Sequence, residues 1–311
     1  MNESGSETTY TTTIDRPVAN LGVAIESATA GSLIDPWFLG SPNERDVQGY
    51  AGTPVNVNEL MPDFGIDLGA AGASFPKVQR FYVTVDSGSD PFTGRSLPGQ
   101  YVLRSWVDDV RPPKIRLVTK RVAQGRPTIV ARVTDAGAGV DPLSLVIAYR
   151  GVLVGAALYD PGSGVAIFPI PKAAQRLRAG RTRAVLSAAD FQEAKNVNGV
   201  GSNILPNTAF RSVSITGVSG PAVSWVSPPR NACVEKTVAL VAVASSTRRV
   251  RSVRFLVDGK QVAIDRRGVS DVFTGTWNAR FALRGTHAVT ALATDAGGRT
   301  FSATRTLRVC H

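Results

Sequence analysis

The feature that most constrains the fold of this chain is an internal repeat. The chain of 311 residues matches itself at a spacing of 108 residues without a gap. The matched pairs are Pro113 with Pro221, Ile115 with Val223, Val130 with Val238, Ala131 with Ala239, Val133 with Val241, Ser144 with Ser252, Gly151 with Gly259 and Val154 with Val262. A repeat of about 100 residues with alternating apolar positions is typical of serial β-sandwiches.

Each copy also contains the pattern of a β-hairpin. Residues 252–265 alternate on both sides of Asp258-Gly259, and the first copy has Arg150-Gly151 at the same place. A type I′ turn needs positive φ at both central residues, which explains why glycine occurs in both copies. Further along, the strand patterns end in Asp190 and in Asp295. The repeat therefore predicts two domains with the same order of strands.

The predicted fold class is all-β: tandem β-sandwiches, with two C-terminal immunoglobulin-like domains preceded by a less regular β-sandwich domain. The expected domains are residues 1–109, 110–218 and 219–311. Short proline-bearing linkers separate them and predict a semi-rigid string of modules. In the first domain, residues 79–86 and 99–109 alternate like strands, while residues 34–76 are rich in glycine and proline. We expect that domain to be β-rich and incomplete at its N-terminus.

Charge is unevenly distributed among the three predicted domains. Residues 1–109 hold 6 basic and 14 acidic side chains, residues 110–218 hold 15 and 5, and residues 219–311 hold 14 and 5. An acidic module beside two basic ones can dock against them, and the basic part can also meet an anionic cell wall, lipid layer or nucleic acid. We predict no specific nucleic-acid partner, because arginine-rich surfaces also serve solubility.

No stretch of the sequence is apolar over the length of a membrane-spanning helix. The first ten residues have neither a basic region nor an apolar one, so they do not resemble a signal peptide. For a secreted protein we therefore expect the export signal in a longer parent, with Met1 at a fragment boundary.

Two cysteines, Cys233 and Cys310, lie near the two ends of the last predicted domain. Closing a loop of this length with a disulfide would stabilise the fold by about 4 to 5 kcal/mol, and the bond persists only in an oxidising compartment. We therefore predict a disulfide between Cys233 and Cys310, and the alternative is a pair of unpaired buried thiols. The spacing does not favour a metal site, since neither a CxxC pair nor a neighbouring histidine accompanies the cysteines.

Residues for nucleophilic catalysis are scarce. The only histidines are His287, which opens a strand pattern, and His311, the last residue. The sequence contains no GxSxG, HExxH, GxxxxGK[ST] or strand-bound GxGxxG motif. We therefore predict that this chain is not an enzyme and needs no cofactor, although an enzyme that uses carboxylates alone stays open.

Aspartates offer two candidate sites for Ca²⁺, which binds six to eight oxygen atoms. Asp135 and Asp141 flank a glycine-rich turn, and Asp190 ends a later strand, so the three carboxylates can meet at one pole of a sandwich. Asp86 and Asp90 flank a short Ser-Gly-Ser segment. The alternative is turn chemistry, in which aspartate side chains accept local backbone N–H bonds.

Arginines in the last domain form a candidate anion-binding cluster: Arg248, Arg249, Arg251, Arg254, Arg266 and Arg267. Val250, Val253 and Phe255 alternate with them, so a solvated strand face explains the same spacing. Trp106, Trp225 and Trp277 occur in apolar strand patterns and are expected in cores, whereas Trp37 is not.

Residues 250–299 carry a family resemblance. Val253, Phe255, Val257, Asp258, Gly259, Trp277, Gly285, His287, Ala291 and Asp295 follow the order found in bacterial Ig-like modules beside catalytic domains in secreted hydrolases. The first copy is similar to a related Ig-like variety, with Ala138 in place of the usual serine. Residues 81–92 and 98–109 resemble the β-rich region after the catalytic domain in some secreted subtilisin-like serine proteases, whose catalytic motifs are absent here.

This resemblance implies extracellular, non-catalytic accessory modules of a larger secreted hydrolase, a subtilisin-like protease, that act in spacing, docking, or binding of substrate or cell surface. The expected partners are an upstream catalytic domain in the same polypeptide and a cell-wall or extracellular polymer. The expected location is the outside or the surface of a bacterial cell. A stand-alone surface adhesion or carbohydrate-binding protein is the alternative.

Overall fold

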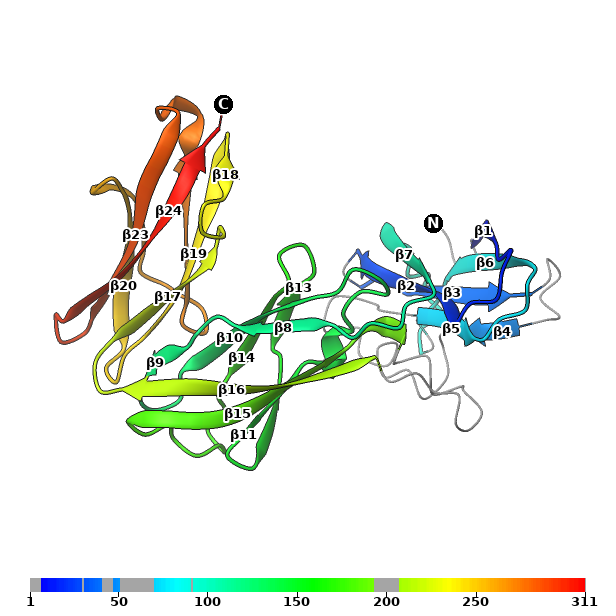
Figure 1. Cartoon of the computed structure of the whole chain (residues 1–311), viewed down its shortest axis with the longest axis horizontal. Helices are drawn as coiled ribbons and strands as arrows, with labels where there is room; N and C mark the ends of the chain where they lie inside the picture. Colours follow the sequence, from blue (N-terminus) through cyan, green and yellow to red (C-terminus); the bar gives the residue numbers. More distant parts are fainter. Residues whose placement is uncertain are drawn as a thin grey trace. The chain divides into compact units, whose positions relative to one another are not determined.

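The computed structural model describes residues 7–29, 31–40, 47–50, 70–90, 92–192 and 207–310, and these residues form β-sheets with short connections (Figure 1). Strand pairs occur within three successive stretches of the chain, and each stretch contributes two sheets. Within the described residues no helix is long and apolar enough to cross a membrane. The fold class expected from the sequence, all-β with several sandwich-like domains, is confirmed.

The N-terminal sandwich has one sheet in the order β1-β6-β3-β4 and another in the order β5-β2-β7. The strand bounds are β1 Glu7–Thr13, β2 Asn20–Ala28, β3 Ile34–Leu39, β4 Val47–Tyr50, β5 Ala70–Ser74, β6 Arg80–Ser87 and β7 Tyr101–Val107. Alternate residues of β2 and β6, among them Ile25, Phe81 and Val85, are fully buried in its core. The predicted strands at residues 79–86 and 99–109 correspond to β6 and β7.

The middle sandwich has the sheets β13-β14-β10-β8 and β12-β11-β15-β16-β9. Its strands are β8 Lys114–Leu117, β9 Arg121–Ala123, β10 Thr128–Thr134, β11 Val146–Tyr149, β12 Val152–Gly155, β13 Leu158–Asp160, β14 Val165–Pro169, β15 Gly180–Ala189 and β16 Thr208–Val218. A short 3-10 helix, η2 (Pro142–Ser144), precedes β11.

The C-terminal sandwich has the sheets β17-β19-β22 and β18-β24-β23-β20-β21. Its strands are β17 Ala222–Ser227, β18 Cys233–Val234, β19 Thr237–Ser245, β20 Val250–Val257, β21 Lys260–Asp265, β22 Val272–Asn278, β23 Gly285–Asp295 and β24 Thr300–Val309. The 3-10 helix η5 (Ala279–Phe281) joins β22 to β23.

The two copies of the sequence repeat have the same strand order. The order β12-β11-β15-β16-β9 matches β21-β20-β23-β24-β18, and β8-β10-β14 matches β17-β19-β22. In both copies the last strand pairs in parallel with a short strand near the start, β16 with β9 and β24 with β18. The hairpin turns also agree, with φ of 47° and 80° at Arg150-Gly151 and of 48° and 80° at Asp258-Gly259. The predicted equivalence of the copies, including both turns, is confirmed.

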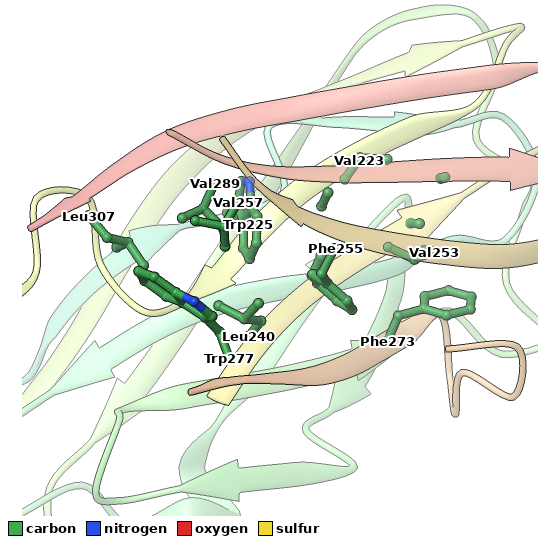
Figure 2. Packing of buried hydrophobic residues seen from close by; sticks show 14 of the residues in the cluster. Val223, Trp225, Leu240, Val253, Phe255, Val257, Phe273, Trp277, Val289 and Leu307 are labelled. Carbon is green, nitrogen blue, oxygen red and sulfur yellow. The ribbon is translucent and has the colours of Figure 1, made fainter. Parts of the chain in front are cut away.

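The core of the C-terminal sandwich contains the tryptophans expected there (Figure 2). Trp225 is 5% and Trp277 6% exposed, and the ring centroids of Trp225 and Phe255 lie 5.7 Å apart. The indole N–H of Trp225 donates to the carbonyl of Ala303 (2.8 Å), so its polar atom is satisfied inside the core. Trp106, in the first sandwich, is likewise buried.

A disulfide joins Cys233, in β18, to Cys310, which follows β24. The Cα atoms are 5.7 Å apart, within the range that a disulfide requires. The bond ties together the two strands that pair in parallel at the edge of the sheet. The predicted pairing is confirmed, and the alternative of two thiols is wrong.

By compactness the chain divides into two units. The first comprises residues 1–114, 134–145 and 188–209, and the second comprises residues 115–133, 146–187 and 210–311. The described residues at the ends of β10 and β15 and directly after them thus belong to the same unit as the N-terminal sandwich, while most strand residues of the two later sandwiches lie in the second unit. His311 lies outside the described residues.

Candidate functional site

Three carboxylates converge in the first unit. One oxygen atom from each of Asp109, Asp135 and Asp190 lies within 4.8 Å of the others. Asp135 and Asp190 were predicted from the sequence to meet at one pole, and the structure brings them together. The third carboxylate comes from Asp109, in the linker before β8, and not from Asp141.

The glycine-rich loop after β10 shapes this cluster. The backbone N–H groups of Gly137 and Gly139 donate to Oδ2 of Asp135 (2.8 and 3.0 Å), and that of Ala138 donates to Oδ2 of Asp109 (2.6 Å). A Cβ atom at position 137 would lie only 2.2 Å from Oδ2 of Asp109, so any other residue there would displace the Asp109 carboxylate from the cluster. Residue 139 adopts a φ of +83°, which glycine tolerates best.

Two carboxamides connect the cluster to neighbouring backbone. Asn207 donates to Oδ2 of Asp190 (2.9 Å) and to the carbonyl of Asp109 (2.9 Å). Asn20, in β2, donates to that carbonyl as well and accepts from the N–H of Asp109 (2.9 Å). Sequence reasoning missed Asp109, Asn20 and Asn207. The sequence feature that could have indicated Asp109 is the pair of aspartates, Asp108 and Asp109, just before the prolines of the linker.

The electrostatics of the cluster follow from its burial. Burial raises the pKa of Asp135, and the negative charge of Asp109 raises it further, against the opposing N–H bond from Gly139 and the positive charge of Arg104. Arg104 donates to the carbonyl of Gly137 (3.3 Å) and forms an ion pair with Glu26. The cluster offers hard oxygen atoms suited to a cation. Its carboxylates also fix the loop by N–H bonds, so Ca²⁺ binding stays a prediction.

Asp141, the third predicted ligand, has a local role. Its carboxylate accepts from the N–H of Leu143 (2.9 Å) and caps the start of η2. Of the second predicted pair, Asp86 lies within β6, whereas Asp90 behaves as turn chemistry describes. Oδ1 of Asp90 accepts the N–H groups of Phe92 and Thr93 (2.8 and 3.0 Å), and these bonds lower its pKa. Among the described residues, neither Asp86 nor Asp90 joins a group of three possible metal ligands.

The predicted arginine cluster is only partly assembled. Arg249, Arg266 and Arg267 line a cavity of about 260 Å³ in the C-terminal sandwich, together with Asp271. Arg248, Arg251 and Arg254 are not among its lining residues. Val250, Val253 and Phe255 are buried in the core, so the strand pattern accounts for the alternation. Because Asp271 brings a carboxylate to the same cavity, this cluster is a poor anion site, and anion binding here stays a prediction.

His287 uses both ring nitrogens within the structure. Nδ1 lies 2.6 Å from Oδ2 of Asp258, in the hairpin turn, and Nε2 lies 2.7 Å from the carbonyl of Leu283. The bond to the Leu283 carbonyl raises the pKa of His287, burial lowers it, and the bond to Asp258 raises it again. This arrangement leaves neither nitrogen free to act as a base and ties the turn to β23.

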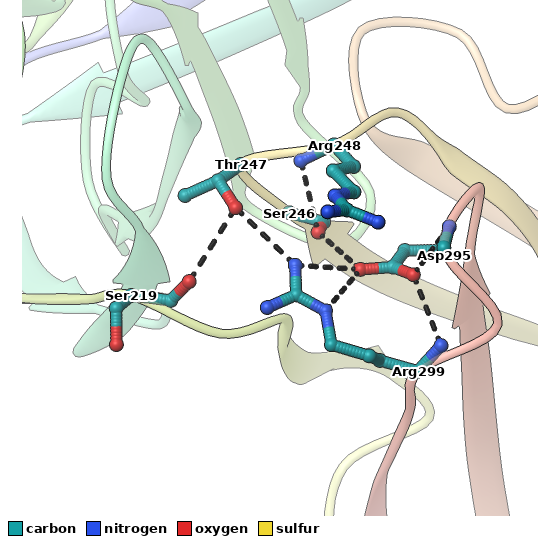
Figure 3. Close-up of polar contacts among 7 residues, drawn as sticks. Ser219, Ser246, Thr247, Arg248, Asp295 and Arg299 are labelled. Carbon is teal, nitrogen blue, oxygen red and sulfur yellow. Dashed lines mark hydrogen bonds and ion pairs between the residues drawn. The ribbon is translucent and has the colours of Figure 1, made fainter.

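Asp295, the counterpart of Asp190 in the second copy, organises a turn (Figure 3). Its side chain is buried, which disfavours ionisation, but hydrogen bonds from Ser246 and Arg299 lower its pKa to about 2. The guanidinium of Arg299 also donates to Oγ1 of Thr247 (3.3 Å), which in turn donates to the carbonyl of Ser219 (3.4 Å). The network holds the segment after β19 against the start of the C-terminal sandwich.

Within the second unit, the two Ig-like sandwiches share an apolar cluster. Val130 of β10 and Val165 and Ile167 of β14 pack with Val226 of β17 and Val243 of β19. All five are less than 9% exposed. Trp225, Ala242 and Ala244, the neighbours in sequence of Val226 and Val243, point into the core of the C-terminal sandwich. The second half of β19 and the centre of β17 are therefore buried on both faces.

Polar contacts surround this apolar cluster. The N–H of Ala123 donates to Oγ of Ser245 (2.8 Å), and that of Thr128 donates to Oδ2 of Asp271 (3.2 Å). The guanidinium of Arg132 donates to the carbonyl of Val226 (3.2 Å). Each contact joins the middle sandwich to the C-terminal one. Together with the apolar cluster, they define the contact between the two sandwiches within the second unit.

A comparison with protein families finds a match for one part of the chain. Residues 221–291 match the family described as Bacterial Ig domain. The match lies inside the C-terminal sandwich. A bacterial Ig domain that carries a disulfide indicates a bacterial protein outside the cytoplasm. A comparison with curated protein sequences finds no match.

Several solved structures resemble the chain at low sequence identity. One is of the fibronectin(III)-like modules of CbhA from Clostridium thermocellum (16% identity, TM-score 0.26, 63% of this chain and 94% of that chain). Another is dimeric latent PorU from Porphyromonas gingivalis (13%, TM-score 0.39, 98% and 32%). A third is SGBP-B from Bacteroides ovatus, in complex with a mixed-linkage heptasaccharide (13%, TM-score 0.28, 99% and 71%). The chain spans about a third of the PorU chain, and these likenesses assign no ligand or activity.

Proposed function

We propose that this chain is a set of non-catalytic modules of a larger secreted hydrolase, a subtilisin-like protease, in which its two Ig-like sandwiches act as a rigid spacer. The apolar cluster of Val130, Val165, Ile167, Val226 and Val243 carries the proposal. Independent modules on a flexible linker need no such cluster, whereas a spacer that holds its ends at a set distance does.

The sequence resemblance supports the hydrolase part of the proposal. The pattern from Val253 to Asp295 resembles that of Ig-like modules beside catalytic domains, and it occupies β20 to β23 of the C-terminal sandwich. In this role the partner is an upstream catalytic domain of the same polypeptide, and the protein acts outside the cell or at its surface. The parent reading frame is expected to encode an export signal and the Asp, His and Ser motifs of a protease.

The interface can be tested in the whole chain with V226A/V243A. The two substitutions remove apolar contacts between the sandwiches and are expected to cost about 2 to 4 kcal/mol. In the wild type the two Ig-like sandwiches should unfold in one calorimetric transition. In the variant this transition should separate into two, and the maximum dimension from small-angle X-ray scattering should broaden.

The matched control is V269A, because Val269 belongs to the same sandwich but is 78% exposed. It should leave the single transition unchanged. Two separate transitions in the wild type would remove the rigid-spacer proposal. Turnover of casein by the purified chain would contradict its non-catalytic role. A parent without protease motifs would favour a stand-alone adhesion or carbohydrate-binding protein.

A further inference from the structure

The second unit contains an open cavity of about 630 Å³ that none of the predicted sites includes. Its size is within the usual range of ligand-binding pockets, about 300 to 1,000 Å³. The polar side chains that line it are those of Gln124, Arg150, Gln175, Arg176, Arg178 and Thr247. They come from the segment after β9, the β11–β12 turn, the segment before β15 and the segment after β19.

These segments are held in place by hydrogen bonds. The N–H of Leu177 donates to the carbonyl of Gly125 (2.8 Å), and the N–H of Gly125 donates to the carbonyl of Leu177 (3.0 Å). Arg126 donates to the carbonyls of Lys172 (2.6 Å) and Ala174 (3.3 Å), which fixes the start of the same segment. The cavity wall is therefore organised before any ligand arrives, which lowers the entropy lost on binding.

Two of the polar side chains are positioned individually. Nε of Arg150 donates to Oε1 of Gln175 (2.9 Å), which leaves the other guanidinium N–H groups and the Gln175 amide group for a ligand. Thr247 is held by Arg299, which Asp295 orients (Figure 3). The charged network around Asp295 thus places one hydroxyl group at this cavity.

The charged side chains that line the cavity are all positive. Arg150, Arg176 and Arg178 contribute three guanidinium groups, and the lining residues include no carboxylate. None of the ion pairs within the described parts of the chain involves these three arginines. Arginine binds carboxylate, sulfate and phosphate through paired N–H groups. This differs from the smaller cavity beside Arg249, where Asp271 supplies a counter-charge.

We propose that this cavity binds a short stretch of an acidic polysaccharide, with the three arginines on its carboxylate or sulfate groups and Gln124, Gln175 and Thr247 on its hydroxyls. The carboxamide and hydroxyl groups suit the hydroxyls of a sugar, and the volume suits a few rings. The lining includes no aromatic side chain on which a nucleic-acid base would stack. The concave shape suits a polymer segment better than a flat lipid surface.

The cavity rests on the contact proposed for the rigid spacer, because Thr247 comes from the C-terminal sandwich and the other polar lining residues come from the middle one. None of its residues belongs to the apolar cluster, so R176A/R178A tests the cavity without removing that contact. The test uses the whole chain and polygalacturonate as the probe, at about 50 mM salt so that screening stays weak. Titration calorimetry should show binding that weakens at least about tenfold in R176A/R178A, since charge-assisted hydrogen bonds are lost. Fully methyl-esterified polygalacturonate, which keeps the sugar rings without the charge, should bind at least about tenfold more weakly than the acid form.

The matched control is R280A/R284A, which removes the same charge from exposed positions of the C-terminal sandwich. Its affinity should stay within about twofold of the wild type, because long-range attraction is screened. Equal losses in both double variants would overturn the proposal, as would equal binding of the esterified polymer or no binding at all. Tighter binding of single-stranded DNA, or binding only to phosphatidylglycerol vesicles, would also overturn it in favour of those partners.

Discussion

The middle and C-terminal sandwiches hold two corresponding short strands, β9 and β18, in different ways. In both, a short strand near the start pairs in parallel with the last strand of the five-stranded sheet. In the C-terminal sandwich the disulfide between Cys233 and Cys310 locks β18 to β24. In the middle sandwich the N–H of Gln124 after β9 donates to the carbonyl of Val218 (2.9 Å), and Ala123 donates to Ser245 of the next sandwich. The same edge is closed by a covalent bond in one copy and by contact with a neighbour in the other.

The corresponding aspartates Asp190 and Asp295 differ as well. Asp295 accepts from Arg299 and Ser246 within its own sandwich, whereas Asp190 accepts from Asn207 and lies beside Asp109 and Asp135. The C-terminal sandwich satisfies this turn internally, while the middle copy uses the same position to build contacts in the first unit.

The largest expected effect comes from breaking the disulfide. C233S/C310S should lower the free energy of unfolding of the C-terminal sandwich by about 4 to 5 kcal/mol, because the unfolded chain regains the freedom of a long loop. Denaturant unfolding followed by tryptophan fluorescence would measure it, since Trp225 and Trp277 lie in this core. A reductant should reproduce the loss in the wild type and leave the variant unchanged. If reductant leaves the free energy of unfolding of the wild type unchanged, the disulfide does not stabilise the C-terminal sandwich.

The second largest effect is expected at low pH, where protonation of Asp295 should destabilise the C-terminal sandwich. Its pKa is lowered from 3.8 to about 2, so the folded state holds the ionised form. The resulting stability is complete above the unfolded value and disappears as the pH falls from about 4 towards 2. D295N should be less stable at neutral pH and should show a flatter acid profile between these values. Thermal midpoints measured across this range would show it, and parallel profiles would argue against the network of Figure 3.

The two type I′ turns offer a direct test of whether the two copies of the repeat are structurally equivalent. G151A and G259A should each cost more than about 1 kcal/mol, because alanine at a positive φ is strained. The two losses should agree, since both glycines have a φ of 80°. G220A is the control, as Gly220 lies in open space without a positive φ, and its stability should hardly change. Clearly unequal losses in the two turns would mean that the copies differ more than their strand order suggests.

The smallest effect is expected from His287, which aligns with Thr182 in the first copy. Its pKa is raised above 6.5, so the protonated ring favours the folded state. That stability is present below pH 6.5 and is lost as the pH rises through the folded value. Because Asp258 is half exposed, the effect should stay under about 1 kcal/mol. H287T should remove this pH dependence, and a variant with the wild-type profile would exclude His287 as its source.

Much of the fold was predictable because it depends on local patterns. The alternation of β20 and the glycine at the hairpin turn act over a few residues, and both copies preserve them. The candidate sites were harder to predict. Asp109 joins Asp135 because a linker folds back over the glycine-rich loop, and no spacing in the sequence encodes that approach. The arginine-rich cavity assembles four segments that are far apart in the chain.

The strand patterns of both copies and both hairpin turns could be predicted from the residues alone, because strand periodicity and turn geometry are short-range constraints that a repeat displays twice. With only two cysteines, a single pairing within the chain was available. Tertiary structure alone decided which surfaces became interfaces. The run at residues 238–244 is apolar at every position, but only the packed structure shows that its second face meets Val130 of the preceding sandwich. Burial of an apolar face is non-directional, so its partner is selected by shape once both sandwiches have formed.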